Sequence, residues 1–62
     1  EAHTDGVEET IIVISGEVII ECCGMKEKLH AGESLIFSAN QPHQYENPTD
    51  EVTVIHLIIQ YR

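Results

Sequence analysis

The chain has 62 residues, enough for one small domain with a limited hydrophobic core. Its hydrophobic content of 42% is that of a globular rather than a disordered protein, and three basic against eleven acidic residues give a net charge of 3 − 11 = −8. That negative charge repels phosphate backbones and anionic lipids, so the chain by itself is predicted to bind neither nucleic acid nor membranes.

Turn-forming residues divide the sequence into short apolar segments at nearly even spacing. Gly, Asn, Asp and Pro favour tight reversals, and the segments between them are rich in β-branched residues, which suit strands better than helices. Short strands separated by turns every ~8–12 residues are typical of a sandwich or barrel. The expected strands are 10–15, 17–21, 26–29, 34–38, 43–47 and 52–61. We expect the first two to form a tight hairpin around Gly16, and the short, polar third strand to lie at a sheet edge.

Two of the expected strands are apolar on both faces. Ile11 and Val13 point to one side of the first strand, and Ile12 and Ile14 point to the other. The last strand shows the same pattern. A lone antiparallel sheet should alternate apolar and polar residues, so a second apolar layer is needed. For a chain this small that layer is most simply another subunit, and we predict a homodimer.

The two cysteines, Cys22 and Cys23, are adjacent. On a strand they would point to opposite faces, and a disulfide between neighbours is strained and rare. We therefore interpret both as plain sheet residues, and a vicinal redox pair is the less favoured alternative. A small secreted domain would normally carry several bridges, so we expect a cytoplasmic protein.

Polar residues at fixed intervals from two histidines are the candidates for chemistry. Imidazole and carboxylate groups suit a divalent transition metal, and His3, Glu9 and His43 would converge if their strands face one interior. Each has a structural alternative: a terminal side chain for His3, a solvated strand entrance for Glu9, and a hydrogen bond to the adjacent turn for His43. We expect Tyr45 to direct its hydroxyl toward the same interior, and Asn47 to cap the turn that follows it.

The spacing of these residues resembles the two cupin motifs. The stretch from His3 to Gly16 is similar to H-x-H-x(3,4)-E-x(6)-G, and the stretch from Gly32 to Asn47 is similar to G-x(5)-P-x-G-x(2)-H-x(3)-N. More narrowly, HTDGVEETIIVISGEVII, LHAGESLIFSANQPHQYEN and the closing IIQY resemble the cupin domain that follows a helix-turn-helix in XRE-type bacterial transcriptional regulators. The resemblance implies an all-β, cupin-type double-stranded β-helix (jelly-roll) barrel. We expect residues 1–62 to be a single domain, truncated at its N-terminal side and forming the C-terminal part of a longer chain.

The resemblance also implies a set of site residues. Cupin enzymes hold iron, manganese or a similar ion with three histidines and a glutamate. Here Asp5 stands at the second histidine position, so the implied ligands for Zn, Ni, Fe or Mn are His3, Glu9 and His43, with Asp5 as a substitute. Ser38 and Asn40 also replace the Pro and Gly of the second motif. The ligand-binding residues expected beside this set are Tyr45, Phe37 and Val13.

Three functions are compatible with this reading. The expected one is a ligand-sensing and dimerisation domain of a helix-turn-helix transcriptional regulator, with a small molecule or metal in the barrel. DNA would then be bound only through an upstream helix-turn-helix, which is consistent with the charge of −8. The alternative is a small cupin metalloenzyme of the dioxygenase or sugar isomerase type, which the loss of one metal ligand disfavours. A third is a dimerisation module with a vestigial pocket.

Overall fold

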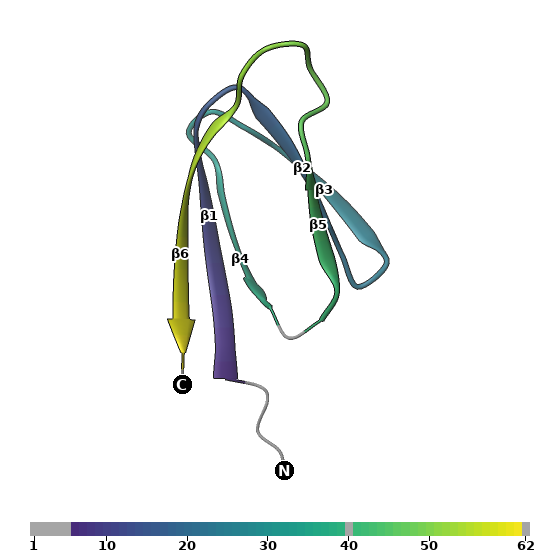
Figure 1. Ribbon diagram of the computed structural model, residues 1–62, viewed down its shortest axis with the longest axis vertical. Helices are drawn as coiled ribbons and strands as arrows, with labels where there is room; N and C mark the ends of the chain where they lie inside the picture. Colours follow the sequence, from purple (N-terminus) through teal and green to yellow (C-terminus); the bar gives the residue numbers. More distant parts are fainter. Residues whose placement is uncertain (1–5, 40, 62) are drawn as a thin grey trace.

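A computed structural model describes residues 6–39 and 41–61, and these form two antiparallel sheets of three strands each (Figure 1). The strand order is β4-β1-β6 in one sheet, called here the β1 sheet, and β3-β2-β5 in the other, the β2 sheet. The described residues contain no α-helix, and none of them belongs to a helix long and apolar enough to cross a membrane. The strands are β1 (Val7–Ser15), β2 (Glu17–Cys22), β3 (Met25–His30), β4 (Ser34–Ser38), β5 (His43–Glu46) and β6 (Val54–Tyr61).

The all-β architecture predicted from the sequence is confirmed, and each expected strand is found with small shifts of its ends. β1 begins three residues earlier than expected, because Glu8 and Glu9 pair with both β4 and β6. β5 ends before Asn47, whose side chain accepts a hydrogen bond from the Thr49 amide at 2.9 Å, so the predicted cap of that turn is present. β3 lies at a sheet edge, as its polar sequence indicated.

The predicted hairpin around Gly16 is wrong. β1 and β2 do not pair; each belongs to a different sheet, and Gly16, with φ of +85°, is the corner between them. The common tight hairpins need at least two loop residues, and this link offers one. The corner is held from the far end of the chain. The Glu17 amide donates to Thr53 Oγ1 at 3.2 Å, and the Thr53 hydroxyl donates to the Glu17 carbonyl at 2.6 Å.

The hydrophobic core lies between the two sheets and is small. Alternate residues of β1 and β2 point inward, as the period of two along a strand requires. Leu35, Phe37 and Ile55 pack against the core from β4 and β6. The buried members are Ile11, Val13, Val18, Ile20 and Leu29.

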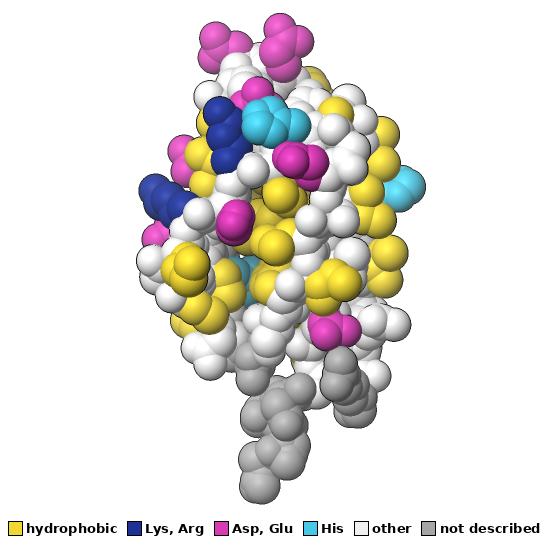
Figure 2. Space-filling model, turned by 180° about the vertical axis from the view of Figure 1, so that it is seen from behind, with side chains coloured by type: hydrophobic (Ala, Val, Ile, Leu, Met, Phe, Trp, Pro, Cys, Tyr) yellow, Lys and Arg dark blue, Asp and Glu magenta, His cyan; other side chains and the backbone are white. Residues whose placement is uncertain are grey.

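The middle of the opposite face of the β1 sheet is also largely apolar, as the pattern of β1 and β6 predicted. Thr10 lies between Ile36 and Ile58 in adjacent strands, and Ile12 lies beside His56. Ile36 is 60% exposed and Ile58 47% exposed. In Figure 2 hydrophobic side chains run down the flank on which β6 lies. We call Thr10, Ile12, Ile36, His56 and Ile58 the outer β1 face.

Candidate functional site

Four side chains from three strands meet between the sheets. Glu9 of β1 is paired in register with Phe37 of β4, while His43 and Tyr45 alternate along β5. The Tyr45 hydroxyl donates a hydrogen bond to Glu9 Oε1, and His43 Nε2 lies 3.6 Å from Glu9 Oε2. Phe37 meets both β5 rings edge-on, with centroids 5.3 Å from His43 and 6.4 Å from Tyr45. We call these four residues the Glu9 cluster.

The carboxylate is the most unusual member, because Glu9 is only 8% exposed. A buried carboxylate needs hydrogen-bond donors, and Tyr45 supplies one. Burial raises the pKa of the Tyr45 phenol, and the hydrogen bond to Glu9 and the negative charge of that carboxylate raise it further. Tyr45 is therefore held in its protonated, donating form.

His43 is oriented by its backbone neighbour. Its Nδ1 lies 2.9 Å from the Gln41 carbonyl oxygen, which can only accept, so Nδ1 carries a proton. The other ring nitrogen, Nε2, faces Glu9. It can pair with the carboxylate when the ring is protonated, or accept a hydrogen bond from a bound molecule when the ring is neutral. The turn contact expected for His43 and its place in the cluster thus exist together.

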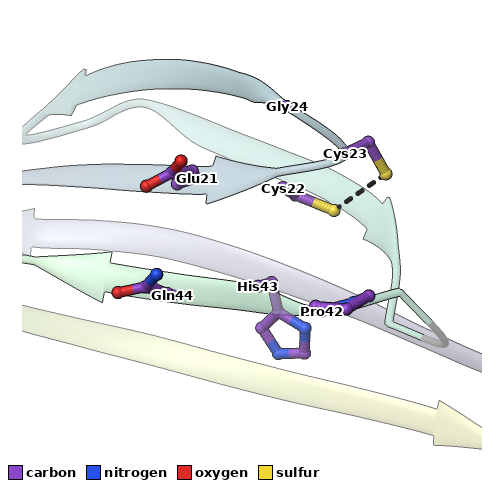
Figure 3. Close-up of a pocket in the computed structure, with 7 residues that line it drawn as sticks. All are labelled: Glu21, Cys22, Cys23, Gly24, Pro42, His43 and Gln44. Carbon is purple, nitrogen blue, oxygen red and sulfur yellow. Dashed lines mark hydrogen bonds between the residues drawn. The ribbon is translucent and has the colours of Figure 1, made fainter.

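A hollow of about 310 Å³ adjoins the cluster at the ends of β2 and β5. His43 belongs to both, while Glu9 and Tyr45 do not line the hollow, so it opens beside the carboxylate rather than over it. Figure 3 shows the side chains around it. The lining residues are Glu21, Cys22, Cys23, Gly24, Pro42, His43 and Gln44.

The presence of a cysteine in this hollow was missed by the sequence analysis. Cys22 is paired in register with His43, on the inward side of β2 that also carries Ile20. Cys23 is not a sheet residue: it lies in the turn after β2 with φ of +59°, and its Sγ is 3.2 Å from that of Cys22. The signal that could have shown this is Gly24, because a turn glycine directly after two cysteines ends the strand between them.

The comparisons with known proteins agree with this geometry. Residues 1–59 match the family described as the cupin domain. The chain belongs to the cupin family. It is also similar to the HTH-type transcriptional regulator SutR of Escherichia coli (strain K12), with 32% identity over 59 residues. That match covers 95% of this chain and 33% of SutR, so the chain spans about a third of that relative. No solved structure matches it significantly.

Within this cupin domain the structure brings Glu9, Phe37, His43 and Tyr45 together, and their roles in binding a ligand or a metal stay predictions. Val13, expected to bind a ligand, is 1% exposed in the hydrophobic core, and its binding role stays a prediction. His3, Asp5 and Asn40 lie outside the described residues.

The donors of the cluster do not by themselves make a metal centre. Among residues 6–39 and 41–61, no group of three or more His, Cys, Asp or Glu side chains is arranged around one ion. Glu9 and His43 face one another and supply two donors, whereas Zn, Ni, Fe or Mn bound by protein takes three or more. The predicted ion therefore depends on His3 or Asp5, and we assign no chemistry to it.

The other two described histidines lie away from the cluster. His30 ends β3, where the Glu33 carboxylate accepts from its backbone amide at 2.7 Å and lies 3.1 Å from its Nδ1. These hydrogen bonds lower the pKa of Glu33. His56 lies on the outer β1 face.

Proposed function

We propose that this cupin domain is the ligand-sensing and dimerisation part of a helix-turn-helix transcriptional regulator. The observation that carries the proposal is the buried Glu9 carboxylate, held by Tyr45 and facing His43 beside an open hollow. A buried carboxylate with few partners destabilises the folded state, and such groups are concentrated at functional sites, where they bind ligands. The similarity to SutR, whose name describes an HTH-type transcriptional regulator, supports the regulatory role.

The cluster favours a small molecule with hydrogen-bond donors. Glu9 and the Nε2 atom of neutral His43 both accept hydrogen bonds, and the Phe37 ring supplies an apolar wall. A molecule that donates to both acceptors would draw β1 and β5 together. A divalent transition metal bound by the same two residues, with His3 or Asp5 completing its shell, is the metal form of the proposal.

The position of Glu9 offers a route from ligand to DNA. β1 is the central strand of its sheet. A ligand that displaces Glu9 would therefore also displace Thr10 and Ile12, which lie on the outer β1 face of the same strand. If that face joins two copies, the ligand changes their relative placement. Dimeric regulators match the spacing of two half-sites, so such a change alters DNA affinity.

The sensing role is tested on the intact protein that contains this domain. We expect its reading frame to encode a helix-turn-helix upstream, and selection from random duplexes to yield a DNA site. Metabolite pools and Zn²⁺, Ni²⁺ and Mn²⁺ are then screened for a change in affinity for that site. His43→Ala should reduce the response at least about tenfold by removing an acceptor worth ~1.5 kcal/mol or more.

The matched control is His30→Ala, which removes a histidine outside the cluster and should keep the response. A parent protein without a DNA-binding segment, or a His43→Ala variant with an undiminished response, contradicts the proposal. A stoichiometric metal that is lost with His43, together with turnover, would support the metalloenzyme instead.

The dimer is proposed to form through the outer β1 face, with a second copy as the occupant. In a chain of charge −8 the five residues of this face are isoleucine, threonine and histidine, and Glu8, the acid nearest to them on β1, lies beyond Thr10 at the end of the strand, so two copies can meet over the apolar residues without burying like charges. Ile58→Asp should convert the dimer to a monomer in analytical ultracentrifugation. Val52→Asp is the control, because Val52 is 80% exposed and lies outside the sheets. A dimer that survives Ile58→Asp places the interface elsewhere.

A further inference from the structure

The adjacent cysteines form a preorganised pair of thiols at the edge of the hollow. Cys22 ends β2 on its inward side, opposite His43, while the positive φ of Cys23 turns the next thiol back toward it. The two Sγ atoms lie 3.2 Å apart, both cysteines are free, and Cys23 is exposed (Figure 3). The sulfurs are therefore close together and open to a reagent that enters the hollow.

The protonation state of the two thiols limits the kinds of reagent with which they react. The hydrogen bond to Cys23 raises the pKa of Cys22, and burial and the nearby Cys23 charge raise it further. Cys22 is thus held as a thiol rather than a thiolate, which slows attack on oxidants and disulfides. A direct disulfide between neighbours is also strained. A pair of this kind favours a reagent that bridges two sulfurs without an oxidant.

Trivalent arsenic and antimony species meet these conditions. Such a centre exchanges two hydroxide ligands for two sulfurs: two As–O bonds break, two As–S bonds form, and each thiol proton leaves with one hydroxide as water. No electrons are transferred. Sulfur is the soft ligand that a soft centre prefers. The described residues offer no three-donor metal group, but a centre that keeps one bond to carbon or oxygen needs only these two sulfurs.

We propose that Cys22 and Cys23 form a dithiol site for a soft trivalent metalloid, bound at the mouth of the hollow beside His43. This inference deepens the sensing function and rests on it for any effect on DNA. The binding itself rests on the two thiols. Cys22 is paired in register with His43, and Tyr45 lies two residues further along β5, so occupation of the site should change the surroundings of the Glu9 cluster.

The test uses phenylarsine oxide, a monosubstituted trivalent arsenical, and the Tyr61→Phe variant. The chain has two tyrosines and no tryptophan, so Tyr45 is then the sole tyrosine emitter. One equivalent should add a single phenylarsenic group by intact mass, remove both titratable thiols and change the Tyr45 fluorescence. Excess glutathione, a monothiol, should not displace the group, and ethanedithiol should.

Cys22→Ser and Cys23→Ser should each weaken binding at least about a hundredfold, because the second sulfur acts at an intramolecular effective concentration. Cys23 is exposed, so Cys23→Ser keeps the test valid if Cys22→Ser fails to fold. Binding should also raise the urea midpoint of the folded domain, since the folded chain holds the sulfurs together and the unfolded chain does not.

An unchanged or lowered midpoint, or displacement by glutathione, would overturn the preorganised site. Binding without a change in Tyr45 fluorescence would overturn its link to the cluster. The proposed function fails separately: a parent protein without a DNA-binding segment leaves arsenical binding intact. A DNA-binding parent that does not respond to phenylarsine oxide contradicts only the regulatory use of the dithiol.

Discussion

Gly16→Ala is expected to lower the free energy of unfolding by about 2–4 kcal/mol, as measured by urea denaturation followed by circular dichroism. Gly16 has φ of +85°, which costs an L-residue roughly 1–2 kcal/mol. The remaining loss is steric. An added Cβ would lie 2.6 Å from Thr53 Oγ1 and 3.0 Å from both the Thr53 Cα and the Val52 carbonyl oxygen. Moving Thr53 away would break its hydrogen bonds to Glu17, which hold the corner between the sheets.

Gly32→Ala is the matched control for this prediction. Gly32 has φ of +90°, but an added Cβ there would meet nothing within 4 Å. The control should therefore lose only the conformational part, roughly 1–2 kcal/mol. The difference between the two losses in the free energy of unfolding is the steric cost that residues 52 and 53 impose by lying close to the corner. Equal losses would show that the β5–β6 connection yields easily and does not fix the placement of the sheets.

The strands were predictable because their signals are local, and their pairing was not. Alternation along a strand and turn residues between strands are written in neighbouring positions, so the six segments were found to within a few residues. Gly16 shows the limit. The residue looked like a hairpin turn, and what makes it a corner is Thr53, on a segment distant in sequence. Hydrogen bonds between residues so far apart in the sequence, such as Glu17 and Thr53, produce no pattern among neighbouring residues from which they could be predicted.

The candidate site was predictable to a similar degree. Motif spacing and the period of two placed Glu9, His43 and Tyr45 toward one interior. The particular contacts were not foreseen, since whether Tyr45 or His43 bonds to Glu9 depends on the register between sheets that share no hydrogen-bonded edge. Cys22 was overlooked for a simpler reason. Treating both cysteines as strand residues separated two thiols that a turn brings together.

Tyr45→Phe is the second variant with a large expected effect, a loss of about 1–3 kcal/mol in the free energy of unfolding. The substitution keeps the ring contacts with Phe37 and His43 but removes a donor from the buried Glu9 carboxylate. Without the Tyr45 hydroxyl, the buried Glu9 carboxylate lacks a hydrogen-bond donor, and this loss lowers the free energy of unfolding by about that amount. In a Glu9→Gln background the same substitution should cost less, about 0.5–1.5 kcal/mol, because the acceptor is neutral. Equal costs in the two backgrounds would mean that the carboxylate charge is solvated from another side.

The pH dependence of the same pair follows from the raised pKa of Tyr45. Because the folded-state pKa lies above the value of about 10 for free tyrosine, the contribution of Tyr45 to stability is complete below that pH and is lost as the pH rises further. In the Tyr61→Phe variant the phenolate absorbance should therefore appear only above pH ~10, together with alkaline unfolding. Adding Glu9→Gln removes the carboxylate charge and should move the ionisation to lower pH. A phenol that ionises like free tyrosine while the domain stays folded would show that Glu9 and Tyr45 are not paired in solution, and the cluster would lose its central contact.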